Sequence, residues 1–89
     1  MHAVVVRVTV NDREAATQEL REKVVPAASQ SPGFVAGYWT RKDGSDQGLS
    51  MLVFESEDAA NETAGRINEM APEAVTVGDV EVREVIANA

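Results

Sequence analysis

The chain contains no cysteine. This absence excludes disulfide bonds, thiolate metal ligands and cysteine nucleophiles, and it fits the reducing cytoplasm in which we expect the protein to work. Histidine occurs once, at His2 near the terminus, where we expect a solvated side chain. A metal centre needs several converging His, Asp or Glu ligands, so we predict neither a metal site nor a bound cofactor.

Positive charge is scarce, with eight Lys and Arg against fifteen Asp and Glu. Residues 1–48 are balanced, with six of each sign, whereas residues 49–89 hold two basic and nine acidic residues. Phosphate backbones require clustered Lys and Arg, so we exclude nucleic acid as a partner. The apolar N-terminal run is short and interrupted by Arg7, so we also predict no membrane partner and no signal peptide.

Low-complexity segments are absent and 44% of the residues are hydrophobic, which indicates a folded chain. With 89 residues we expect one domain over residues 1–89, with its core at about residues 3–87.

The first half of the sequence predicts a strand followed by a helix. Residues 3–10 are mostly β-branched, with Val4, Val6 and Val8 on one face. The Asn11-to-Glu14 spacing is typical of a capping box, and an apolar stripe carries a helix to about residue 28. Pro26 predicts a kink or an early end of that helix.

The remaining elements follow from turn and cap residues. Ser31-Pro32-Gly33 predicts a turn, residues 34–42 a strand, residues 43–48 a hairpin loop and residues 49–55 a further strand. Ser56 is placed to cap a second helix that Pro72 ends. Residues 74–87 predict a last strand, bent near Gly78.

The order β-α-β-β-α-β predicts an α+β subunit of the ferredoxin-like class. Right-handed crossovers then give a four-stranded antiparallel sheet with two helices on one face. We expect the first and third strands at the centre, with the second and fourth at the edges.

The other face of this sheet is predicted to be partly apolar. If Val4 faces the helices, the opposite face carries Ala3, Val5, Arg7 and Thr9. Two alternatives stay open for the second strand (Val35, Gly37 and Trp39, or Phe34, Ala36 and Tyr38) and for the third (Leu52 and Phe54, or Met51 and Val53). In the fourth strand we expect Val80, Val82 and Ile86 to face the helices. An apolar patch of this size favours a partner, and a second copy of the chain is the simplest one.

The order of elements, the Ser31-Pro32-Gly33-Phe34 turn and the segment from Phe54 to Ala59 resemble the dimeric α+β barrel superfamily, in particular its antibiotic biosynthesis monooxygenase-like group. The resemblance implies a homodimer. It also implies a range of activities: some members oxidise polycyclic aromatic substrates without a prosthetic group, some degrade haem, and many have no assigned activity.

The haem-degrading members use an asparagine on the first strand, a tryptophan in the second helix and an iron-ligating histidine. Here Asn11 follows the strand, the second helix has no tryptophan, and no histidine follows His2. Haem degradation is therefore disfavoured.

Three residues are candidates for binding or catalysis. Trp39 and Tyr38 are suited to grip a planar aromatic ring, or else to pack in the core or interface. Arg7 is suited to stabilise negative charge, or else to pair with Glu81 or Glu84. We therefore predict a monooxygenase-like protein that binds a small aromatic molecule; the alternative is a non-catalytic homodimer whose open sheet face serves only assembly.

Overall fold

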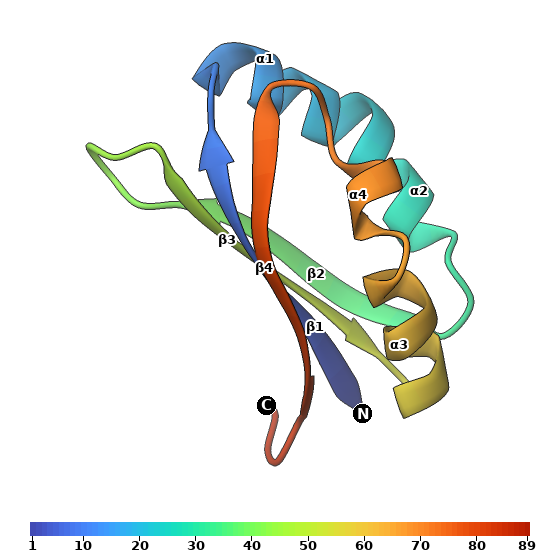
Figure 1. Cartoon of the computed structure of the whole chain (residues 1–89). Coiled ribbons are helices and arrows are strands. Elements are labelled where there is room, and N and C mark those ends of the chain that lie inside the picture. The colour runs from blue at the N-terminus through green and yellow to red at the C-terminus, as the bar shows by residue number, and fades with distance from the viewer.

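The computed structural model describes all 89 residues as one sheet covered on one side by helices (Figure 1). In chain order the elements are β1 (His2–Val10), α1 (Arg13–Glu19), the π-helical segment η1 (Leu20–Val24), α2 (Val25–Ser29), β2 (Phe34–Arg41), β3 (Gln47–Phe54), α3 (Glu57–Ala64), α4 (Ile67–Met70) and β4 (Val75–Glu84). The sheet has the order β2-β3-β1-β4 with every neighbouring pair antiparallel. The predicted ferredoxin-like class and the central positions of β1 and β3 are confirmed.

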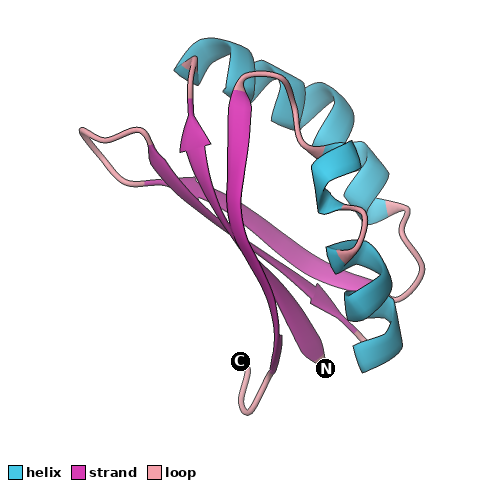
Figure 2. Ribbon diagram, in the orientation of Figure 1, coloured by secondary structure: helices cyan, strands magenta, loops and turns pink.

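The core lies between the sheet and the helices (Figure 2). Val4 and Phe54 are fully buried there, and the Phe34 ring meets Phe54 edge-on, with ring centroids 5.8 Å apart. Burying such side chains stabilises the fold by about 1.5–3 kcal/mol each. Small residues of the helices, Ala28 and Ala60, are fully buried against them and so permit a close approach to the sheet.

A β-bulge in β2 settles which residues of this strand face the helices. Phe34 pairs with Phe54 and Ala36 pairs with Val53, so Val35 is an extra residue and is exposed. The bulge shifts the alternation by one. Phe34 and Trp39 consequently share the helix-covered face although five positions separate them.

Neither alternative predicted for β2 is therefore complete. Ala36 and Tyr38 lie on the open face, whereas Phe34 faces the helices. On β3 the parity is simple: Leu52 and Phe54 are buried under the helices, and Met51 and Val53 face the open side.

Pro26 distorts the first helix without ending it. The helical run continues to Ser29, but residues 20–24 form a π-helical turn in which the Val25 N–H donates to the Leu20 carbonyl. Proline has no N–H and its ring crowds the carbonyl one turn earlier, so a wider turn just before it relieves the clash. The predicted end near residue 28 is confirmed.

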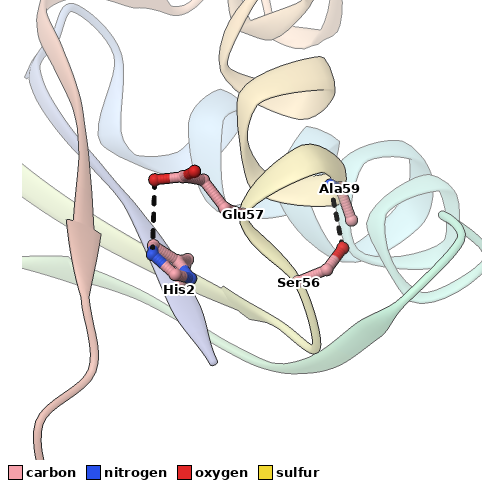
Figure 3. A network of polar contacts seen from close by, with 4 residues as sticks. All are labelled: His2, Ser56, Glu57 and Ala59. Atoms are coloured by element: carbon pink, nitrogen blue, oxygen red, sulfur yellow. Dashed lines mark hydrogen bonds and ion pairs between the residues drawn. The ribbon is translucent and has the colours of Figure 1, made fainter.

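One helix cap is the predicted residue, and the other is not. The Ser56 hydroxyl accepts from the Ala59 N–H at 3.1 Å, as predicted (Figure 3). The first helix is capped by Asp12, whose carboxylate accepts from the Ala15 N–H at 3.1 Å. The prediction of Asn11 as the cap was wrong because its side-chain amide donates to Thr76 Oγ1, at 2.9 Å, and ties β1 to β4.

His2 is not the solvated residue that its terminal position suggested. Its Nε2 lies 3.5 Å from Glu57 Oε2 at the start of α3, with 22% of the side chain exposed (Figure 3). Residue 2 has the same parity as Val4 and Val6, so strand alternation turns its ring towards the helices.

The last strand is bent where predicted but ends earlier. Gly78 and Asp79 stand opposite the single residue Arg7, and a Cβ at position 78 would lie 3.1 Å from the Arg7 carbonyl oxygen. Val80 and Val82 face the helices as expected. Ile86 does not, since β4 ends at Glu84 and Ile86 is 90% exposed. None of the helices has the length and apolarity needed to cross a membrane.

Candidate functional site

A cavity of about 140 Å³ lies between the sheet and the first helix. Val6, Val8 and Leu52 form part of its floor, and Ala16, Leu20 and Val24 of the helical run form part of its roof. Ile67 and Met70 of α4 close another side. Thirteen of its nineteen lining residues are hydrophobic, so the cavity is suited to an apolar ligand.

Trp39, the only tryptophan, contributes an aromatic wall to the cavity. Its six-membered ring lies over Gly37: a Cβ built at position 37 would lie 2.8 Å from Trp39 Cη2 and 3.0 Å from Cζ3. Real Cβ atoms essentially never approach another atom so closely, so the missing side chain at position 37 is what permits this placement of the indole.

Ser50 supplies a hydroxyl group to the cavity. In the sheet it stands between Trp39 on β2 and Val6 on β1, and the residue is buried. Every fully buried side-chain oxygen or nitrogen of the chain has a hydrogen-bond partner. The Ser50 hydroxyl makes no hydrogen bond within the chain, so its oxygen is not fully buried. This oxygen is accessible from the cavity, where the hydroxyl can donate a hydrogen bond to a ligand or accept one from it.

All charged side chains in the lining are arginines. Arg13 comes from the first turn of α1 and Arg41 from the end of β2, and none of the fifteen Asp and Glu residues lines the cavity. Arg41 Nη1 donates to the Ser45 carbonyl at 2.7 Å and to the Lys42 carbonyl at 3.2 Å, which fixes its guanidinium. Arg13 is exposed and takes part in no ion pair.

The three residues singled out from the sequence do not converge. Trp39 lines the cavity, whereas Tyr38, next to it on the strand, lies on the open face and is 67% exposed. Arg7 pairs in register with Leu49 on that same open face. Within one chain, Trp39 and Tyr38 therefore cannot hold the two sides of one ring, and Arg7 does not reach a ligand beside Trp39.

The ion pair considered for Arg7 is not formed. Glu81 pairs with Arg83, two residues along β4, and Arg7 takes part in no salt bridge of the chain. Glu84 stands opposite His2 in the register, a position that belongs to the helix-covered face.

Sequence reasoning missed Arg13, Arg41 and Ser50. A signal was present for Arg41, because it follows Trp39 by two residues and so shares its face of the strand. Arg13 precedes the buried Ala16 by three residues, which places both on one side of a helix. Ser50 shares its face of β3 with Leu52, but the sequence alone does not determine which face of this strand meets the helices.

The open face of the sheet is a second feature of the surface. Tyr38, Leu49 and Met51 are exposed hydrophobic residues on β2 and β3, and Figure 1 shows no helix on this side. The cavity and this face lie on opposite sides of the sheet, so covering the face does not fill the cavity.

No protein-family model and no curated protein matches the sequence. The chain is similar in structure to SnoaB, a cofactor-independent oxygenase from Streptomyces nogalater, with a TM-score of 0.75 and 17% identity over 98% of this chain and 94% of that one. It is also similar to MhuD, a heme-degrader from Mycobacterium tuberculosis with two hemes bound in its active site, with a TM-score of 0.63 and 18% identity over 98% of each chain.

These similarities define the class of fold. This chain shares the ferredoxin-like α+β fold of SnoaB and MhuD along almost its whole length. The resemblance that the sequence suggested is thereby confirmed at the level of the fold.

Proposed function

We propose that this chain is a monooxygenase-like protein that binds a small aromatic or enolisable molecule in the cavity beside Trp39 and oxygenates it without a cofactor. The observation that carries the proposal is the apolar cavity itself, with one indole and one free hydroxyl on its wall. Apolar pockets with a few polar groups are the usual form of small-molecule sites. The fold of SnoaB, a cofactor-independent oxygenase, adds support by analogy.

The chemistry requires little from the protein. In the balanced reaction a ring CH2 group reacts with O2 to give a ring C=O group and water, so the carbon loses four electrons and the oxygen molecule gains four. The substrate supplies the electrons from its enolate. The cavity contributes binding, orientation and exclusion of water, with Trp39 stacking on the ring and Ser50 hydrogen-bonding to an oxygen of the ligand.

Haem does not fit this site. The cavity measures about 140 Å³, whereas pockets for drug-sized ligands measure roughly 300–1,000 Å³. Its lining also contains no histidine, since His2 lies beside Glu57 instead.

Oxygen uptake tests the proposal. Purified protein should accelerate O2 consumption by a one-ring enolisable substrate, with the rate unchanged by a metal chelator. Saturable binding of the substrate without faster O2 consumption would indicate a binding protein and not an oxygenase. The absence of both binding and faster O2 consumption would contradict the proposal.

We also propose that two copies pair through their open faces. Tyr38, Leu49 and Met51 support this arrangement because they expose apolar surface that a second sheet would cover. The same face supports the second candidate function, a non-catalytic dimer. The cavity discriminates between the two, because an assembly protein has no need of a ligand beside Trp39.

A further inference from the structure

The distribution of charge around the cavity is opposite to that of the chain. The protein has a net charge of −7, yet the charged side chains in the cavity lining are two arginines and no acids. Nine of the acids lie in residues 49–89, which contribute Ser50, Leu52 and residues of α4 and β4 to the lining, but each of their carboxylates lies elsewhere.

Arg13 and Arg41 reach this cavity from separate elements. Arg41 is half-buried and held by two loop carbonyls through one nitrogen, Nη1, which leaves its other N–H groups able to donate. Arg13 has no partner among the acids of the chain. A guanidinium group binds carboxylates and enolates through paired, charge-assisted N–H donors.

The volume of the cavity suits a ligand with a single ring. A cavity of about 140 Å³ is close to the engineered cavity of about 150 Å³ that binds benzene. One aromatic or enolic ring therefore fits within it.

The lining offers no group that could remove a proton from the ligand. It contains no carboxylate and no imidazole, and those are the usual general bases of proteins. Oxygenation without a cofactor requires an electron-rich anion, so the ligand has to be anionic when bound. Positive charge beside an acid favours its ionised form, which is the contribution that the two arginines can make.

We propose that the ligand of this cavity is a one-ring organic anion, with its ring against Trp39 and its carboxylate or enolate at Arg13 and Arg41. This inference rests on the proposed function, because it names the class of molecule that the same cavity takes.

Fluorescence of the single tryptophan allows a direct test with the intact protein. Benzoate and benzyl alcohol are the probes, since they have nearly the same size and differ in charge. Benzoate should give a saturable change in Trp39 emission and bind about tenfold more tightly than benzyl alcohol, as a charge-assisted hydrogen bond allows. Added salt should weaken benzoate binding and leave benzyl alcohol binding unchanged.

Variants then locate the charge. Arg13→Gln should weaken benzoate binding about tenfold and leave benzyl alcohol binding unchanged. Arg41→Gln should act in the same direction, with its melting temperature measured because Arg41 also holds the loop. Arg21→Gln is the matched control: Arg21 is exposed on the same helical run but does not line the cavity, so benzoate binding should change less than about twofold.

The outcomes distinguish failure of the anion inference from failure of the proposed function. Equal binding of both probes, or tight benzoate binding that survives both Arg13→Gln and Arg41→Gln, overturns the anion inference and leaves small-molecule binding intact. If neither probe changes Trp39 emission or the melting temperature, both the anion inference and the proposed function fail.

Discussion

The indole ring of Trp39 occupies the space above Gly37 that any other residue at position 37 would fill with its own Cβ. The two residues are two positions apart on the edge strand β2, so they share its helix-covered face. Phe34 borders the same space, because its Cζ lies 3.2 Å from that hypothetical Cβ. Gly37 therefore sets where the aromatic wall of the cavity stands.

Gly37→Ala should displace this indole. The added methyl group meets rigid ring atoms, so we expect a loss of about 1–3 kcal/mol in the free energy of unfolding, together with a shift in Trp39 emission. Chemical denaturation and emission spectra measure the two effects. Gly65→Ala is the control, because its Cβ would meet its nearest atom at 3.6 Å and its φ of −68° suits alanine. Equal stability of both variants would show that Gly37 does not position the indole.

Tyr38→Glu should prevent dimerisation without emptying the cavity. A charge in the centre of an apolar interface is costly to desolvate, so light scattering at micromolar concentration should report a monomer for the variant and a dimer for the parent chain. Ligand titrations of Trp39 should be unchanged, because Tyr38 points to the other side of the sheet. Asn68→Glu, on the exposed surface of α4, provides a control with the same charge change. A parent chain that is monomeric at this concentration would contradict the assembly proposal.

Ser56→Ala should destabilise the fold by about 1 kcal/mol, because the hydroxyl satisfies the Ala59 N–H at the start of α3. Ser29→Ala removes a hydroxyl of another kind, one that donates to the Val25 carbonyl a turn earlier. Ser29 is exposed and alanine favours helix, so the free energy of unfolding should change by less than about 0.5 kcal/mol. Thermal unfolding measures the stability of both variants. Similar losses of stability in the two would show that the Ser56 hydroxyl does not stabilise the fold as a helix cap.

The sequence predicted the architecture well because the strands and caps are locally encoded. Alternating valines in β1 fix its buried face, and Ser56 with Pro72 brackets the second helical region. The dimer, the single domain and the cytoplasmic location stay predictions. The site was harder to predict, because Phe34 to Trp39 is apolar at nearly every position and the bulge at Val35 is visible only once Phe34 and Phe54 are paired.

Strand alternation explains the main error about the site. Trp39 and Tyr38 are consecutive residues of β2 and point to opposite faces of the sheet, whereas the prediction placed both beside one ligand and gave its charge to Arg7. The register separates them across the sheet and brings Arg41 and Ser50 to the side of Trp39 instead. Likewise, Asn11 and Asp12 both suit a helix cap, and only the contact of Asn11 with Thr76, 65 residues away, distinguishes them.

If the cavity beside Trp39 holds a one-ring ligand, as proposed, Ser50→Val should weaken the binding of that ligand. Valine places two methyl groups in the cavity where the hydroxyl now stands, and it suits a strand, so the melting temperature should be retained or raised. In a titration with benzoate, Trp39 emission should change saturably in the parent chain. The variant should bind benzoate at least about tenfold more weakly. Identical saturable curves for the two proteins, or no saturable change in the parent chain, would show that the cavity does not hold this ligand.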